Sequence, residues 1–104
     1  MQRIASILRV KKGYESEYKK RHDEIWPELS KLLTKAGIRD YSIFLDRKTG
    51  NLFAVHKVTK NNTLADLPKH PLMKKWWAAN ADIMETNPDN SPASQPLEEV
   101  FRME

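Results

Sequence analysis

The segment "YESEYKKRHDEIWPELSKLLTKAG", Tyr14 to Gly37, decides the fold. Aromatic and apolar side chains recur in it at every third or fourth position, which predicts helix. Pro27 interrupts this pattern because proline lacks an N–H and disfavours the helical conformation in the residue before it, Trp26. We therefore expect a break or kink near Glu24 to Trp26. A second helical piece then begins at Pro27 and stops at Gly37.

Alternating apolar and polar residues on both sides of this segment predict strands. One strand covers residues 3–10, two more at 41–45 and 52–58 form a hairpin, and a last strand covers 97–103. Another helix is expected to begin at Pro71. Its predicted apolar face consists of Met73, Trp76, Trp77, Asn80, Ile83 and Met84. The order βαββαβ predicts a ferredoxin-like α+β fold, an antiparallel sheet with the helices on one face, in a single domain of residues 1–104.

Composition excludes several classes of protein. The chain has 104 residues, of which 39% are hydrophobic and 31% charged, as in globular proteins. No stretch approaches the roughly 18 consecutive apolar residues of a membrane span. The net charge of +4 comes from basic pairs scattered among acids, which argues against a nucleic-acid partner. The lack of cysteine, and Lys11 and Lys12 in place of a signal cleavage site, favour the cytoplasm.

The predicted architecture leaves the second face of the sheet uncovered. The apolar residues expected there are Ala5, Ile7, Phe44 or Ile43, and Val100 or Phe101. An apolar face of this size is seldom left in water. We expect a second copy of the chain to cover it, giving a homodimer, because acidic and basic side chains share the strands and no aromatic pair stands on the first and third strands.

His22 is the histidine with the most informative surroundings. It follows Tyr18 by four residues and precedes Trp26 by four, so the three side chains share one helical face near the expected break. A histidine in such a pocket can donate or accept a proton near neutral pH. The alternative is a helix histidine satisfied by a neighbouring carboxylate, Asp23 or Glu24.

The other two histidines give weaker signals. His56 is interpreted as a sheet residue with one hydrogen bond, and His70 as an exposed turn residue. No two histidines have the spacing of metal ligands, so a metal site is not expected.

The adjacent pair Trp76-Trp77 cannot point both indoles into the core in the same way, since neighbours on a helix diverge by about 100 degrees. We expect one indole to pack and the other to cover the apolar face of a sugar ring. The alternative is that both tryptophans fill a small core. Tyr41 begins the second strand, where its hydroxyl can reach the pocket edge or where it is a half-buried strand tyrosine. Neither a glycine-rich phosphate loop nor a nucleophile elbow is present.

Several motifs together resemble the L-rhamnose mutarotase family, small enzymes that interconvert the α and β anomers of a sugar. They are "EYKKRHDEIWPEL", "YSIFLD", "LFAV", "KKWWAANADIM", "NPDNSP" and "LEEVF". The resemblance implies that His22 is the proton donor. It also implies that the sugar is contacted by Tyr18, Tyr41, Trp76 and Trp77. The family is similar to dimeric α/β-barrel proteins, and its reaction requires no cofactor.

Three questions stay open at this point. The second proton carrier is a hydroxyl of Tyr18 or Tyr41, or a bound water. One alternative is a sugar- or RNA-binding module, since RNA-recognition domains share this order of elements. Another is a cofactor-free monooxygenase-like enzyme of the dimeric barrel type. No role is assigned to residues 59–69 or to the "NPDNSP" loop.

Overall fold

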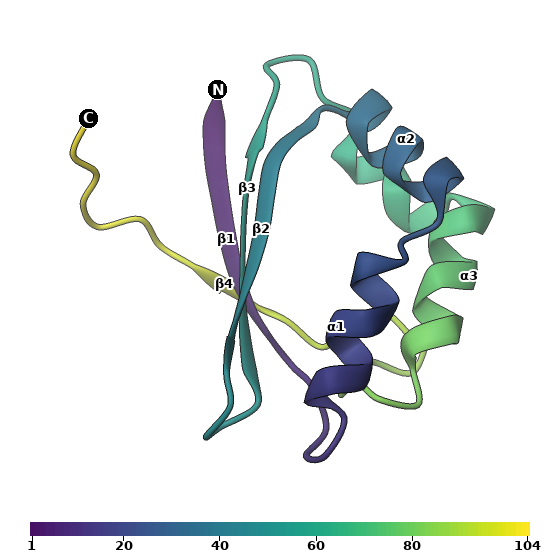
Figure 1. Ribbon diagram of the computed structural model, residues 1–104. Coiled ribbons are helices and arrows are strands. Elements are labelled where there is room, and N and C mark those ends of the chain that lie inside the picture. The colour runs from purple at the N-terminus through teal and green to yellow at the C-terminus, as the bar shows by residue number, and fades with distance from the viewer.

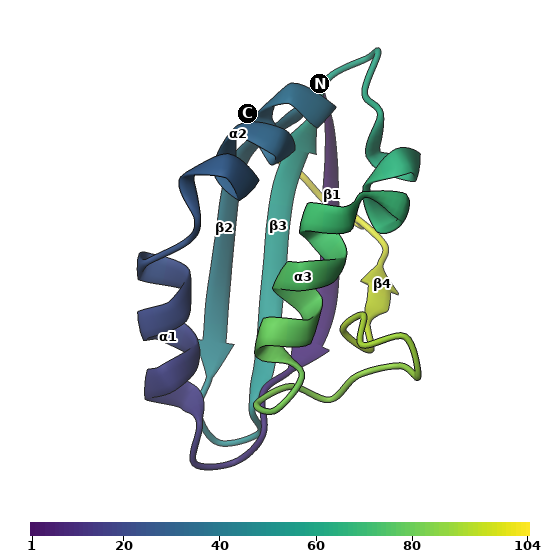
Figure 2. The same ribbon diagram turned by 90° about the vertical axis from the view of Figure 1, so that its right-hand side faces the viewer.

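The sheet consists of four antiparallel strands in the order β2-β3-β1-β4 in the computed structural model, which describes residues 1–104. The strands are β1 (Gln2–Arg9), β2 (Ile38–Asp46), β3 (Asn51–Val58) and β4 (Gln95–Leu97). The helices are α1 (Glu15–Asp23), α2 (Pro27–Ala36), α3 (Pro71–Asn80) and the 3-10 helix η1 (Leu64–Lys69). All helices lie over one face of the sheet (Figures 1 and 2), so the predicted ferredoxin-like fold is confirmed.

The break between the first two helices lies where the sequence predicts it. Helix α1 ends at Asp23, and Trp26 has an extended backbone with ψ of 129° before Pro27 opens α2. Gly37 ends α2 with φ of +108°, a conformation that favours glycine. A Cβ at this position would also lie 2.5 Å from Thr59 Oγ1. Both the backbone angle of Gly37 and the close approach of the segment that contains Thr59 therefore require glycine at this position.

The last strand and the end of α3 differ from the prediction. β4 covers only Gln95–Leu97, where it pairs with the middle of β1, and residues 98–104 then leave the sheet (Figure 1). Within one chain this tail has no strand to pair with, and Phe101 is 78% exposed. Helix α3 ends at Asn80, so Ile83 and Met84 lie beyond it. They are buried because a turn brings Met84 into a β-bridge with Val10.

The side of the sheet away from the helices carries an apolar patch. β1 and β3 pair along their whole length, and the alternation that turns Leu52 and Ala54 toward the helices turns Phe53 and Val55 away from them. We call this surface the open face. Its apolar members are Ala5, Ile7, Phe44, Phe53, Val55 and Leu97. Of the predicted alternatives, Phe44 occupies this face, whereas Ile43 packs on the helix side.

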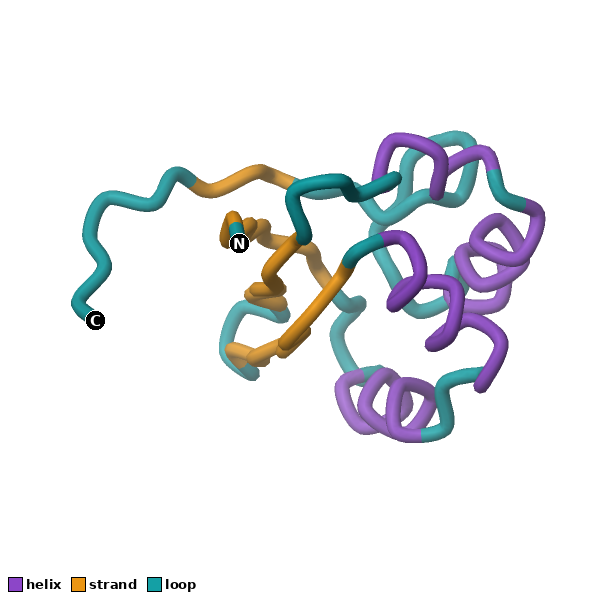
Figure 3. The backbone as a smooth tube through the Cα atoms, turned by 90° about the horizontal axis from the view of Figure 1, so that it is seen from above, coloured by secondary structure: helices purple, strands orange, loops and turns teal.

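The hydrophobic core between sheet and helices is small. Only 13 of the 104 residues are buried. The largest buried cluster consists of Val10, Tyr18, Leu52, Ile83 and Met84. Seen from above, the helices stand in an arc beside the sheet (Figure 3). The core fills only part of the interior because a cavity occupies the rest, as described below. No helix in the chain combines the length and apolar character that a membrane crossing requires.

Candidate active site

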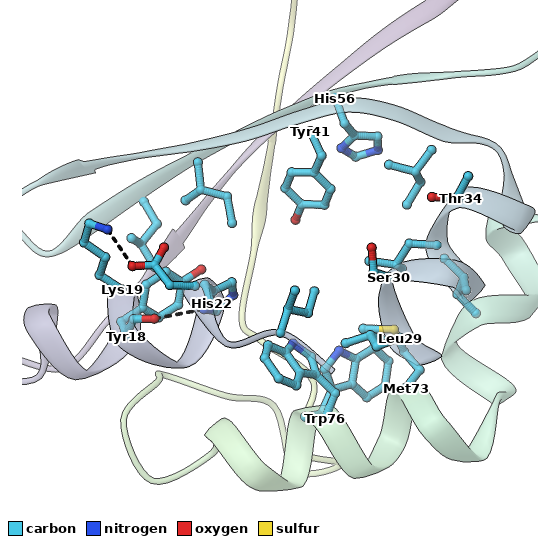
Figure 4. Close-up of a pocket in the computed structure, with 18 of the residues that line it drawn as sticks. Tyr18, Lys19, His22, Leu29, Ser30, Thr34, Tyr41, His56, Met73 and Trp76 are labelled. Carbon is cyan, nitrogen blue, oxygen red and sulfur yellow. Dashed lines mark hydrogen bonds and ion pairs between the residues drawn. The ribbon is translucent and has the colours of Figure 1, made fainter. Parts of the chain in front are cut away.

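A cavity of about 960 Å³ separates the sheet from the helices (Figure 4). It is lined by 25 residues, of which 14 are hydrophobic, and they come from α1, α2, α3, η1, β2 and β3. A second hollow of about 450 Å³ lies toward the loop of residues 86–94. The two hollows share seven wall residues, Tyr18, His22, Tyr41, Pro68, Met73, Trp76 and Trp77. A mostly apolar cavity with a few polar groups is the usual form of a small-molecule site.

All five residues singled out from the sequence lie in this shared wall. They are Tyr18 and His22 on α1, Tyr41 on β2, and Trp76 and Trp77 on α3. Segments far apart in the sequence therefore meet at one place.

Helix α1 fixes the orientation of the His22 ring. The ring stacks on the Tyr18 ring one helical turn earlier, with centroids 4.0 Å apart and planes 26° apart. His22 Nδ1 lies 3.0 Å from the Tyr18 carbonyl oxygen. Because a carbonyl only accepts hydrogen bonds, Nδ1 carries a proton and the neutral ring has its free electron pair on Nε2. The predicted alternative of a carboxylate partner is wrong, because the ring bonds the Tyr18 carbonyl and makes no hydrogen bond or ion pair with Asp23 or Glu24. Asp23 instead accepts a hydrogen bond from Lys19.

Burial lowers the pKa of His22, an effect that the bond to the Tyr18 carbonyl and the nearby Asp23 only partly oppose. Near neutral pH the ring is therefore mainly uncharged. Nε2 is then ready to accept a proton, and once protonated it becomes an acid. A group that changes between these two forms suits reactions that move one proton between two oxygens.

The two tyrosines of the wall are hydrogen-bond donors and not bases. Burial, together with the proximity of Tyr41, raises the pKa of Tyr18 far above its usual range, and burial also raises the pKa of Tyr41. Tyr18 is only 8% exposed, whereas Tyr41 is 45% exposed and points its hydroxyl into the cavity (Figure 4). Both phenols therefore stay neutral at physiological pH.

A β-bulge turns Tyr41 toward the cavity. The pairing of β2 with β3 shifts between Arg39 and Ser42, so two residues of β2 face one residue of β3. In a regular strand, residues an odd number of positions apart face opposite sides of the sheet. Ile38 faces the helix side and Tyr41 follows it by an odd number of positions, so without the bulge Tyr41 would face away from the helices. Asp40 adopts a left-handed φ of 51° in this bulge, and Lys57 lies 3.6 Å from its carboxylate.

The two tryptophans of α3 have different surroundings. Trp76 makes edge contacts with His22, at a centroid distance of 5.3 Å, and with Trp26, at 5.1 Å. Trp77 lines both hollows but makes no such ring contact. Trp76 is thus the packed indole and Trp77 the free aromatic surface, although both are partly exposed to the cavity.

Helix α1 is fastened to the turn after α3 by Arg21. Its guanidinium donates hydrogen bonds to Glu17, to the Ala79 carbonyl and to both carboxylate oxygens of Asp82. These bonds raise the pKa of Arg21 and lower that of Asp82. Since His22 and the tryptophans lie on the two elements that Arg21 joins, this side chain helps to set the width of the site.

Two parts of the cavity wall were not predicted. Leu64, Leu67 and Pro68 of η1 close one side, and the only sequence signal for them was their apolar character within an irregular segment. His56 also lines the cavity, and its ring stacks on Tyr41 with centroids 5.1 Å apart. The prediction of a histidine with one hydrogen bond is wrong, because neither ring nitrogen has a partner in the chain and Nδ1 is buried.

No group of three or more histidine, cysteine, aspartate or glutamate side chains comes together in a way that would hold a metal ion. Asn80, at the end of α3, lines the second hollow, and its Nδ2 donates to the Trp76 carbonyl. His70 is exposed, as expected, and its Nδ1 accepts a hydrogen bond from the Leu72 amide, so it caps α3.

Comparison with known proteins shows which family the chain resembles. A sequence model of the L-rhamnose mutarotase family matches residues 3–103. The chain is 56% identical over 102 residues to an L-rhamnose mutarotase of Flavobacterium johnsoniae, covering 98% of this chain and 95% of the relative. It is 58% identical over 96 residues to one of Rhizobium etli, covering 92% and 91%.

A solved structure extends the similarity to three dimensions. The crystal structure of an L-rhamnose mutarotase from Formosa agariphila superposes with a TM-score of 0.93 at 49% identity, covering the whole of both chains. The family match thus covers the segments that build the cavity. The chain belongs to the L-rhamnose mutarotase family.

Proposed function

We propose that this protein interconverts the α and β anomers of L-rhamnose by opening and reclosing the pyranose ring, with His22 as the proton donor to the ring oxygen. The observation that carries this mechanism is the state of the His22 ring. Nδ1 is held by the Tyr18 carbonyl, and Nε2 is left free in a ring that lines the cavity. The membership of the chain in the L-rhamnose mutarotase family supports the substrate.

The reaction needs one proton to move from one oxygen on C1 to the other. Neutral His22 accepts the proton of the anomeric hydroxyl at Nε2 while C1 and that oxygen become a carbonyl. The C1–O5 bond breaks, and Nε2 returns the same proton to O5. Rotation about C1–C2 then presents the other face of the aldehyde, and the reverse steps close the ring. The proton count balances, so His22 can serve as base and acid in turn.

The remaining wall residues hold the sugar in this scheme. The indole of Trp77, and the part of Trp76 left exposed, cover the apolar face of the ring. Tyr18 and Tyr41 remain neutral, so they donate to sugar oxygens or pass a proton between the anomeric hydroxyl and His22. Correct placement of the ring adds to the factor of about 10² to 10⁴ that one acid–base group contributes.

Saturation-transfer NMR across a panel of free sugars tests this function. Irradiating the anomeric proton of one form should diminish the signal of the other in proportion to enzyme concentration, and most strongly for L-rhamnose. L-Fucose and L-lyxose are the comparison sugars, because they differ from L-rhamnose in hydroxyl configuration or in the methyl group. Equal exchange for all of them would contradict the assignment of L-rhamnose as the preferred substrate.

We also propose that a second copy of the chain covers the open face, in a cytoplasmic homodimer. Phe44 on this face is 66% exposed, and the tail beyond β4 exposes Val100 and Phe101, so a large apolar surface lacks cover in the single chain. The absence of cysteine is consistent with a reducing compartment. Light scattering after size-exclusion chromatography should give twice the chain mass of 12.1 kDa. The mass of a single chain at micromolar concentration would contradict the dimer.

A further inference from the structure

Two buried side-chain polar atoms in the chain lack a hydrogen-bond partner, and both belong to residues of the cavity wall. They are Asn80 Oδ1, in the second hollow, and His56 Nδ1, in the larger cavity. Buried polar atoms are nearly always paired in native proteins, because an unpaired one has lost its water without compensation. Because these two atoms are themselves shielded, a ligand in the cavity can bind only a group of the same side chain that remains accessible.

His56 is the stronger of the two cases, because its whole imidazole is unengaged. Nδ1 is shielded on all sides and has no partner, so a ligand in the cavity cannot reach it. Nε2 also makes no hydrogen bond within the chain and is not one of the shielded atoms, so it is the ring nitrogen that a ligand can reach. The ring stacks on Tyr41 with planes 28° apart, so its orientation is held by packing alone. Figure 4 shows the ring descending from the sheet beside Tyr41 toward the cavity.

The surroundings of His56 leave it uncharged. Asp40, on the neighbouring strand, has Lys57 3.6 Å from its carboxylate, and no acid is within ion-pair distance of the His56 ring. Burial lowers the pKa of His56. The accessible Nε2 of a neutral imidazole is a donor or an acceptor according to the tautomer, and a sugar hydroxyl can both donate and accept. The two are thus suited to each other.

Its position separates His56 from the reacting end of the site. His22 lines both hollows, whereas His56 lines only the larger one. In Figure 4 the ring lies beyond Tyr41 as seen from His22. A pyranose whose C1 and O5 lie at His22 therefore presents carbons on the opposite side of its ring, C3 and C4, toward His56.

We propose that His56 is a specificity-determining residue that binds a hydroxyl on C3 or C4 of the sugar, opposite the anomeric centre. The proposal rests on the proposed function for its choice of sugar. A site built to hydrogen-bond a hydroxyl rejects analogues that lack it, because the protein group is then left unpaired. Tyr41 supports this role by holding the imidazole ring in its plane.

The test compares His56→Leu, which removes both hydrogen-bonding groups at similar volume, with His56→Gln, which keeps a donor and an acceptor. Half-saturation and maximal exchange rate are measured by saturation-transfer NMR for L-rhamnose and for its 2-deoxy, 3-deoxy and 4-deoxy analogues. His70→Asn is the matched control, since His70 lies outside the cavity and an asparagine oxygen at the N-cap can accept the hydrogen bond from the Leu72 amide in its place. Circular dichroism melts show that each variant is folded.

For His56→Leu we expect the half-saturation for L-rhamnose to rise at least about tenfold, with a maximal rate within about threefold of the wild type. The difference in half-saturation between His56→Leu and the wild type should vanish for either the 3-deoxy or the 4-deoxy sugar. It should persist for the 2-deoxy sugar. His56→Gln should restore part of the affinity, and His70→Asn, which keeps the cap of α3, should leave both the half-saturation and the maximal rate unchanged. An equal rise for every sugar, or no rise for any, would overturn the proposal.

Sugar binding, measured by tryptophan fluorescence, distinguishes a failure of the proposal for His56 from a failure of the proposed function. If the wild type binds L-rhamnose without exchanging its anomers, the mutarotase mechanism fails, and the same pattern of binding losses still tests His56. If the wild type binds none of these sugars, the proposal for His56 is refuted as well.

Discussion

The pH dependence of anomer exchange is a direct consequence of the environment of His22. Burial lowers its pKa below the ordinary value of 6.5, and the proposed cycle begins with the neutral ring, which accepts a proton at Nε2. The rate should therefore be constant near neutral pH and fall on the acid side. Below the pKa of His22, each further pH unit should lower the neutral fraction, and with it the rate, about tenfold.

Stability should change in the same direction, and the sign follows from proton binding. Between the lowered pKa in the folded state and 6.5 in the unfolded state, the unfolded chain binds more protons at His22. Acidification through this window therefore destabilises the folded protein. His56, whose pKa burial also lowers, contributes with the same sign. The loss of rate must accordingly be measured where the protein is still folded.

The assay is saturation transfer on L-rhamnose from about pH 8 down to about pH 5. Spontaneous exchange is subtracted using a sample without enzyme, and circular dichroism at each pH confirms that the protein is folded. Replacing His22 with glutamine should remove most of the catalysed rate, and the remaining rate should no longer fall as the pH is lowered. A catalysed rate that increases as the pH falls would refute the reasoning, because it would mean that His22 begins the cycle as the cation.

Three further predictions concern the rest of the molecule. Trp77→Ala should weaken sugar binding by about 1 to 3 kcal/mol without a comparable fall in maximal rate, and an unchanged half-saturation would assign Trp77 to packing alone. Arg21→Ala should lower the free energy of unfolding in urea by about 1 kcal/mol, whereas Lys19→Ala, which breaks only an exposed pair, should change it by less than about 0.5 kcal/mol. Equal effects would contradict the proposed role of Arg21. Deleting residues 98–104 should shift a dimer toward monomer in sedimentation velocity, and an unchanged dimer would remove the tail from the interface.

The sequence predicted the fold well because local signals and long-range packing agree. Pro27 and Gly37 fix the limits of α2 through their own backbone chemistry, which does not depend on the rest of the chain. The last strand was predicted at residues 97–103, later in the sequence than the observed β4. Alternation shows which residues are able to form a strand, whereas pairing with a neighbouring strand decides which of them form one. Within one chain, β1 offers pairing only to Gln95–Leu97.

The site was predicted only in part, for a related reason. Helical spacing brings Tyr18 next to His22, so this pair was visible in the sequence. The stacking of Tyr41 on His56 depends on a bulge that changes the register of β2, and no local pattern announces that shift. The contribution of η1 to the wall depends on how an irregular segment packs, which the sequence does not specify.

The most direct test of the central claim is the exchange rate of L-rhamnose anomers with the wild type and with His22→Gln, compared at equal and saturating sugar. Glutamine keeps a polar side chain of similar size but cannot take up and return a proton at neutral pH. We expect the maximal exchange rate to fall by a factor of about 10² to 10⁴, with little change in the sugar affinity measured by tryptophan fluorescence titration. Full exchange activity in the variant would contradict it.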